Sequence, residues 1–145
     1  MAAIRLCRAA LPGMKERKWG RIINVLNIGA KAPCAGSAPT AVSRAAGLAL
    51  TKVLAGEGAP HNVLVNALMV GLIKSSQWET AYANSGSNDS YEVFTQNMAD
   101  GRNIPLGRID KTDEFANIAC FLTSDQAGYI TGTSINVDGG ACPVV

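Results

Sequence analysis

Residues 21–27 of this chain read RIINVLN, and residues 40–52, after a loop rich in glycine and proline, read TAVSRAAGLALTK. The first segment is a short β-branched apolar run that ends in a polar residue, which is typical of a parallel strand covered on both faces. The second segment has apolar residues at the spacing of one helix face: Val42, Ala45, Ala46, Ala49, Leu50 and Val53. In α/β enzymes, catalytic residues are expected in a strand, a loop and a helix that follow one another in this order.

The neighbouring segments extend this pattern in both directions. Residues 2–18 have apolar residues at helical spacing, and we expect Pro12 to bend or shorten that helix. Glycines and a proline at 56–60 are stop signals, and residues 62–68 then read NVLVNAL, a second buried strand. Two buried strands joined by a helix form a βαβ unit, which is parallel and right-handed in nearly all cases.

Residues 74–103 predict two short helices separated by a polar break at 85–88. Two such helices after the carboxyl end of a strand are what a substrate-covering insertion would look like. A plain surface connection between strands is an equally good interpretation of the same residues.

The last part of the chain predicts one more helix and a third strand. Asp110 is placed to cap the helix, whose buried stripe consists of Phe115, Ile118, Ala119 and Leu122. Residues 129–140 predict a turn followed by the strand. The fold class is therefore α/β, with at least three strands and flanking helices.

The length and charge of the chain limit the number of domains and the kinds of partner that we expect. A length of 145 residues and a mass of 15.1 kDa predict a single domain covering residues 1–145. The formal net charge is +2, and the basic residues are scattered, which argues against a nucleic-acid partner. Charged and polar residues interrupt every apolar run, so we expect no membrane span, and without the order of a signal peptide we expect a cytoplasmic protein.

The cysteines and the apolar content suggest two further properties. The four cysteines have no CxxC or Cys/His spacing, which predicts reduced thiols and no metal site. Hydrophobic residues make up 48% of the chain and charged residues 17%, which indicates that surface is buried against partners. We therefore expect a homo-oligomer.

Several motifs together resemble the short-chain dehydrogenases/reductases, which are NAD(P)-dependent oxidoreductases with a doubly wound, Rossmann-like parallel sheet. The strongest is YITGTSINVDGG at residues 129–140, which is similar to the family's closing strand. GRIINV at 20–25, SRAA at 43–46, VLVNA at 63–67 and IPLGR at 104–108 follow in the family's order and spacing.

The resemblance is to the second half of the family's fold. It implies a partial doubly wound sheet with three of the usual seven strands, lacking the amino-terminal nucleotide-binding strands. The family's glycine-rich turn, which sets the cofactor pyrophosphate on a helix N-terminus, has no counterpart in this sequence. NAD or NADP is the implied cofactor, and we expect that this chain does not bind it alone.

The family's catalytic serine, tyrosine and lysine fall on Asn27, Thr40 and Arg44. In the family the serine holds the substrate oxygen, and the tyrosine exchanges a proton with it while the lysine lowers the tyrosine pKa. Asn27 can still donate a hydrogen bond, and Arg44 keeps a positive charge of different shape. Thr40 is not an equivalent acid, because an aliphatic hydroxyl ionises well above the phenol pKa of about 10.

The family's cofactor-contact segment after the second strand corresponds to residues 70–75. Gly71, Ile73 and Ser75 are candidates for the remnant of a nicotinamide site. The alternative, which we favour, is a strand end that turns, with Gly71 allowing the backbone conformation.

Three hypotheses follow for function. The chain is a family oxidoreductase polypeptide that is inactive alone, a divergent reductase completed by another chain, or a non-enzymatic oligomerisation module built on its small-residue helices. In each case the strand at 22–26 is left with an open apolar edge, which favours pairing with another chain as a dimer or tetramer, including exchange of elements. The sequence contains no pattern that specifies a substrate.

Overall fold

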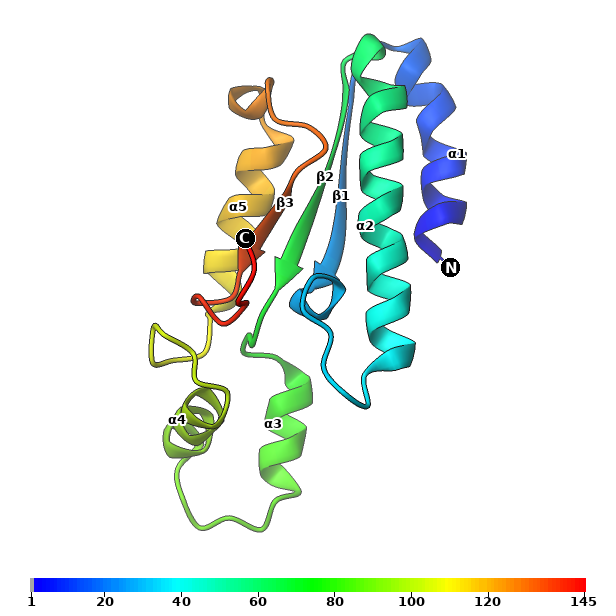
Figure 1. Ribbon diagram of the computed structural model, residues 1–145. Coiled ribbons are helices and arrows are strands. Elements are labelled where there is room, and N and C mark those ends of the chain that lie inside the picture. The colour runs from blue at the N-terminus through cyan, green and yellow to red at the C-terminus, as the bar shows by residue number, and fades with distance from the viewer. Residues whose placement is uncertain (1) are drawn as a thin grey trace.

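Three parallel strands form one open sheet in the computed structural model, which describes residues 2–145 (Figure 1). The strand order is β1-β2-β3, so β2 lies between the other two. This confirms the α/β fold with a partial Rossmann-like sheet of three strands and flanking helices. The strands are β1 (Gly20–Asn27), β2 (Val63–Val70) and β3 (Ser134–Val137), and the α-helices are α1 (Ala2–Glu16), α2 (Ala38–Gly58), α3 (Ser76–Ala83), α4 (Tyr91–Gly101) and α5 (Thr112–Thr123).

β2 is the central strand, and every residue from Val63 to Met69 is buried. Its continuous apolar run suits a strand that is covered on both faces and paired on both edges. β1 pairs with β2 in register from Gly20 opposite Val63 to Asn27 opposite Val70. Within the described residues β1 has no partner on its other edge, and its Val25 is 54% exposed, as the open edge predicted from the sequence requires.

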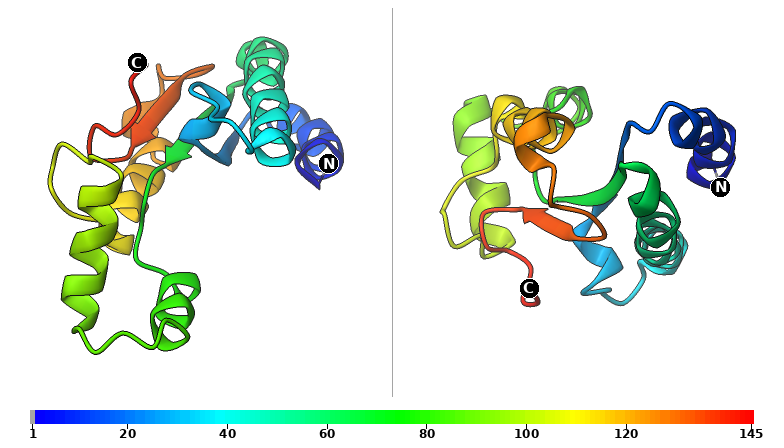
Figure 2. Two further views of the ribbon diagram at one scale, coloured as in Figure 1. Left: turned by 60° about the horizontal axis from the view of Figure 1, so that its bottom comes forward. Right: turned by 90° about the horizontal axis from the view of Figure 1, so that it is seen from above.

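Helices cover both faces of the sheet, as the view from above shows (Figure 2). α1 and α2 pack on one face through a cluster that contains Cys7, Leu11, Leu54, Ala55, Val63 and Val65. α5 covers the other face, where Phe115, Ile118, Ala119 and Leu122 pack with Leu68, which confirms the stripe predicted for this helix. No helix in the described part of the chain has the length and apolarity needed to cross a membrane.

The face of α2 that packs on the sheet differs from the apolar face predicted from the spacing of its residues. Val42 and Val53 are 69% and 57% exposed, whereas Gly47, Thr51 and Leu54 are buried. Gly47 is buried because α2 passes so close to β1 that a Cβ at this position would lie 2.7 Å from Cδ2 of Leu26. The small-residue surface predicted from the sequence therefore divides: Gly47 packs on the sheet, and Ala45, Ala46 and Ala49 face outward.

Pro12 lies inside α1, which continues to Glu16, and the bend or shortening expected from it stays a prediction. One local expectation is corrected. Asp110 does not cap α5: the capping residue is Lys111, whose backbone N–H donates to Oε2 of Glu114 at 2.9 Å. The backbone of Asp110 instead forms an isolated parallel bridge with Ile73, outside the three-stranded sheet.

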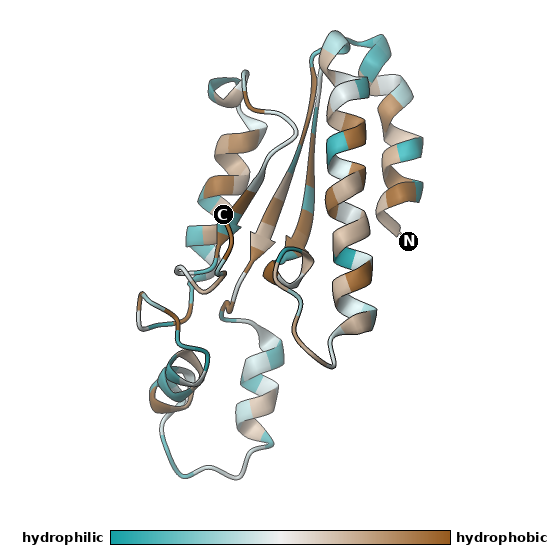
Figure 3. Cartoon of the chain, in the orientation of Figure 1, coloured by the Kyte–Doolittle hydropathy of each residue, from teal (hydrophilic) through white to brown (hydrophobic). Residues whose placement is uncertain are grey.

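The two short helices predicted after the second strand are present as α3 and α4. They lie beyond the carboxyl ends of the strands (Figure 1), where they project away from the layered body (Figure 2). α3 is largely hydrophilic (Figure 3) and has no buried residue. α4 is anchored by Ala99, which packs with Leu72, Ile104 and Ile109 in a separate apolar cluster.

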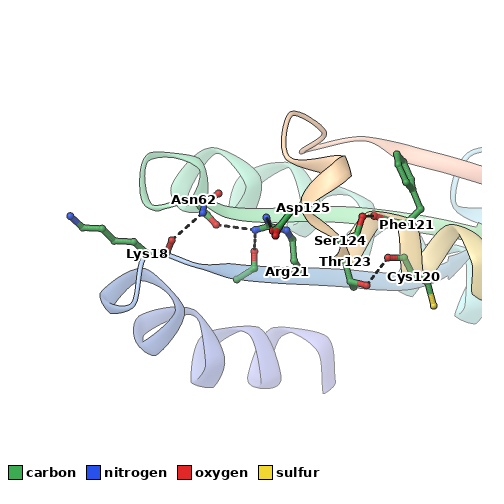
Figure 4. Close-up of polar contacts among 9 residues, drawn as sticks. Lys18, Arg21, Asn62, Cys120, Phe121, Thr123, Ser124 and Asp125 are labelled. Carbon is green, nitrogen blue, oxygen red and sulfur yellow. Dashed lines mark hydrogen bonds and ion pairs between the residues drawn. The ribbon is translucent and has the colours of Figure 1, made fainter.

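A buried arginine joins the amino ends of β1 and β2 to the segment after α5 (Figure 4). The Arg21 side chain is 5% exposed, and its Nη1 donates to the backbone oxygens of Gly20 at 2.9 Å and Asn62 at 3.2 Å. Its Nη2 lies 3.6 Å from Oδ1 of Asp125, and the guanidinium lies 5.1 Å from the ring centre of Trp19. This end of the sheet is therefore closed by internal contacts.

Candidate functional site

A cavity of about 510 Å³ lies at the carboxyl ends of β1 and β2. Asn27 reaches it from the end of β1, Thr40 from the first turn of α2, and Gly71 from the residue after β2. The structure thus brings together three of the six positions selected from the sequence. Parallel strands direct their carboxyl ends to one edge, which is where α/β proteins bind ligands.

Asn27 carries the least satisfied polar group of the cavity. Its Oδ1 is buried and has no hydrogen-bond partner in the described residues. The same atom would lie 3.2 Å from a Cβ at Gly29, so the glycine in the following turn leaves room for the amide. A buried amide oxygen without a partner costs free energy, and a ligand group that donates a hydrogen bond to it recovers that cost.

Thr40 and Arg44 are one turn apart on α2, but only Thr40 lines this cavity. Arg44 instead lines a separate groove of about 540 Å³ along the open edge of β1, together with Ile23 and Val25. Thr40 is exposed, and its backbone oxygen accepts a hydrogen bond from Oγ of Ser43 at 2.9 Å. The cavity therefore contains a hydroxyl and an amide, without a positive charge from Arg44 beside them.

Gly71 has a packing role that explains its identity. A Cβ at this position would lie 2.6 Å from Cα of Asp138, so the backbone after β2 passes against the turn that follows β3. Gly71 is not among the glycines with positive φ, so close approach rather than backbone freedom requires it. This observation supports the structural interpretation of Gly71 over the cofactor-binding one.

Ile73 and Ser75 lie outside the residues that line the cavity. Ile73 forms the backbone bridge with Asp110, and Ser75 precedes α3 as its N-terminal capping residue. Their assignment as the remnant of a nicotinamide site stays a prediction.

Two cavity residues were missed in the sequence. Cys34 comes from the loop between β1 and α2, and Arg102 comes directly after α4. Both side chains are exposed. Neither belongs to a motif, and only the fold brings the end of α4 back to the carboxyl ends of the strands.

A cluster of charged residues lies next to the candidate cavity, around a second cavity of about 550 Å³ that shares Leu72 with it. Both nitrogens of the Arg108 fork donate to Glu114, at 2.8 and 2.6 Å. These bonds hold the pKa of Glu114 far below its ordinary value. Burial, followed by the hydrogen bond to Glu114 and its charge, raises the pKa of Asp110 to about 6.

The comparison with protein families agrees with the architecture. A family model described as enoyl-(acyl carrier protein) reductase matches residues 1–142, nearly the whole chain. The chain therefore belongs to the short-chain dehydrogenase/reductase family of oxidoreductases, as the motifs in its sequence indicate.

Individual relatives make the comparison more specific. Acetoacetyl-CoA reductase from Shinella zoogloeoides is 37% identical over 128 residues, which cover 88% of this chain and 49% of that protein. The structure of L-sorbose reductase from Gluconobacter frateurii with NADPH and L-sorbose has a TM-score of 0.90 at 34% identity, covering all of this chain and 56% of the reductase.

A third relative is an NADPH-bound short-chain oxidoreductase from Pseudomonas aeruginosa PAO1, which contains an atypical catalytic center. Its TM-score is 0.86 at 32% identity, with coverage of 96% of this chain and 52% of that one. The chain thus spans about half the length of the relatives it matches.

Proposed function

We propose that this chain forms the substrate side of a short-chain dehydrogenase/reductase and that it does not catalyse carbonyl reduction with NADH or NADPH by itself. The observation that carries the proposal is the cavity shared by Asn27 and Thr40, the positions that correspond to the family's serine and tyrosine. They lie where a substrate oxygen would be held, but they differ chemically from the residues that they replace.

The chemistry of these side chains supports binding more than proton transfer. The Asn27 amide can donate a hydrogen bond to a carbonyl oxygen and so orient it. The Thr40 hydroxyl is a poor proton donor near neutral pH, since general acid catalysis requires a pKa near the operating pH. Arg44, in the separate groove, does not contribute the charge that lowers a neighbouring pKa.

The cofactor side is proposed to come from another polypeptide segment. The two solved relatives described above bind NADPH, so NAD or NADP is the cofactor class that we propose for the complete site. The open edge of β1 is a suitable place for such a segment to add a strand, because an unpaired parallel edge has free N–H and C=O groups. This is the divergent reductase completed by a second chain.

Calorimetric titration of the pure chain with NADH and NADPH tests the proposal. We expect no micromolar binding and no reduction of acetoacetyl-CoA, and the full-length acetoacetyl-CoA reductase from Shinella zoogloeoides serves as the positive control. The double variant Thr40→Tyr, Arg44→Lys should stay inactive, because restoring the acid does not supply a nucleotide site. Micromolar NADPH binding or turnover by the unmodified chain would overturn the proposal.

One observation favours a second function, that of an oligomerisation module. Val42 and Val53 on α2 are separated by three helical turns and expose one apolar face together with Ala45, Ala46 and Ala49. Leu6 on the adjacent helix α1 is 69% exposed. Apolar surface of this kind on neighbouring helices favours association through a symmetric helix pair.

Light scattering at low micromolar concentration tests association. We expect a dimer or tetramer, and Val42→Glu should shift it toward the monomer by placing a charge in the interface. Val93→Glu is the matched control, because Val93 is 45% exposed on α4 and away from this face. A monodisperse monomer of the unmodified chain would contradict the oligomer, as would an equal effect of the two variants.

A further inference from the structure

Arg102 is the single charged residue among those that line the candidate cavity. The other lining residues are apolar, small or neutral polar, and include Asn27, Cys34, Thr40 and Gly71. A pocket of this composition has no negative charge of its own, so a cation at its wall favours a ligand with an anionic group.

Arg102 is free to bind such a group. The ion pairs in residues 2–145 involve Lys15, Arg21 and Arg108, and no carboxylate pairs with Arg102. No side-chain hydrogen bond from Arg102 is present in this part of the chain either. A planar guanidinium without partners can bind a carboxylate or phosphate through two parallel hydrogen bonds.

The backbone holds Arg102 beside the cavity although its side chain is exposed. The N–H groups of Arg102 and Ile104 both donate to the backbone oxygen of Ala99, at 3.2 and 3.1 Å. Ala99 and Ile104 are buried in the apolar cluster that contains Leu72. The base of the Arg102 side chain is therefore anchored to the wall of the cavity.

The first turn of α2, which also lines the cavity, adds positive potential. Ser37, Thr40 and Ala41 line the cavity at the N-terminus of this helix, which is 21 residues long. Ser37 precedes the helix without a capping hydrogen bond from its side chain. The positive end of the helix dipole is thus directed toward the cavity, where it favours an anion.

We infer that the cavity binds a small carbonyl compound that carries a carboxylate or a phosphate, and that Arg102 holds the anionic group while the amide nitrogen of Asn27 donates a hydrogen bond to the carbonyl oxygen. This inference rests on the proposed function, since it takes the cavity as the substrate side of a reductase. It goes beyond that function by naming the substrate class and a residue that determines specificity.

Alkylation of Cys34 reports on this charge without any need for NADPH or turnover. Iodoacetate is anionic and iodoacetamide neutral, and the same thiolate attacks the CH₂ carbon of each and displaces iodide, so the ratio of their rates isolates the local potential. We expect this ratio, measured by peptide mass spectrometry, to be about threefold to tenfold higher at Cys34 than at Cys120, which is exposed on α5.

Three variants connect the ratio to Arg102. Arg102→Gln should lower the ratio at Cys34 toward that at Cys120, leaving only the contribution of the α2 N-terminus, whereas Arg102→Lys should keep most of it. Arg8→Gln removes the same charge from exposed α1, outside the cavity, and should leave the ratio unchanged. No excess at Cys34, or an excess that Arg102→Gln does not reduce, would overturn the inference.

Protection experiments identify the anion. Acetoacetate or dihydroxyacetone phosphate should slow the reaction of Cys34 with iodoacetamide in the unmodified chain but not in Arg102→Gln. Protection by only one of the two compounds identifies the anionic group that the cavity binds as a carboxylate or as a phosphate. Methyl acetoacetate, the neutral ester, should not protect, and equal protection by ester and acid would overturn the inference. Because neither readout depends on catalysis, a failed reductase assay leaves these results interpretable.

Discussion

The two ends of the sheet use their polar side chains differently. At the amino ends, Arg21 is buried, and its guanidinium donates to two backbone oxygens and lies beside Asp125 (Figure 4). The guanidinium also lies against the Trp19 ring, and its Nε is the one nitrogen without a partner in the described residues. At the carboxyl ends, Arg102 has no internal partner, and Oδ1 of Asn27 is buried without one in the described residues.

This contrast distinguishes polar groups that stabilise the fold from polar groups that could bind a ligand. Polar groups that are already paired contribute to the folded state, and a ligand cannot use them without breaking those bonds. Polar groups left unpaired at the edge of a cavity contribute little to folding and are available to a ligand. The polar groups at the amino end of the sheet therefore connect parts of the fold, and those at the carboxyl end line the candidate site.

The largest expected effect comes from Arg21. Arg21→Met keeps most of the side-chain volume but leaves the backbone oxygens of Gly20 and Asn62 without this donor, so we expect a loss of about 2–3 kcal/mol in the free energy of unfolding. Urea denaturation followed by circular dichroism measures it. Arg102→Met is the matched control, with a change within about 0.5 kcal/mol. Equal losses in the two variants would remove the contrast between the two ends.

A smaller loss in the free energy of unfolding is expected for a substitution at Gly71. It tests whether the backbone is tightly packed at the carboxyl ends of the strands, where polar side chains are unpaired. Gly71→Ala places a Cβ 2.6 Å from Cα of Asp138, and we expect a loss of about 1–2 kcal/mol in the same urea experiment. Gly101→Ala, in open space at the end of α4, should be neutral or slightly stabilising. An unchanged stability in Gly71→Ala would show that the turn after β3 moves freely.

The smallest expected effect is a pH dependence of stability caused by Asp110, which lines the second cavity. Its pKa is raised to about 6 in the folded chain from an ordinary value of 3.8, so the folded state binds more protons than the unfolded state between these values. Stability must then fall as pH rises from about 4 to about 6, because the buried carboxyl ionises unfavourably.

Asp110→Asn removes this titration while keeping a hydrogen-bond donor toward Glu114. The difference in melting temperature between Asp110→Asn and the unmodified chain should therefore shift in favour of the variant from pH 4 to pH 6.5 and then level off. Thermal melts across this range measure it. A difference that is constant with pH would contradict the raised pKa.

Much of the fold could be predicted because its signals are local. The apolar runs that became β1 and β2, the stripe of α5 and the two short helices α3 and α4 all follow from residue spacing within single segments. Three of the six selected site positions, Asn27, Thr40 and Gly71, meet in one cavity because they follow or face the carboxyl ends of neighbouring strands.

Other features depended on contacts that spacing does not encode. The buried face of α2 is set by Gly47, which allows close approach to Leu26, and not by the larger residues Val42 and Val53. Arg44 shares the helix with Thr40 but lies in another groove. Asp110 does not cap α5 but forms an isolated backbone bridge with Ile73, which is distant in sequence.

The sequence by itself determined the α/β class, the membership in the short-chain dehydrogenase/reductase family and the replacements at Asn27, Thr40 and Arg44. These follow from the order of residues along the chain, which carries strand runs and motifs directly. Only the tertiary structure decided that Arg102 and Asn27 line one cavity and that the Nη atoms of Arg21 bind groups within the fold. Such pairings arise when the packing of α4 and the sheet brings distant segments together, and no local pattern records them.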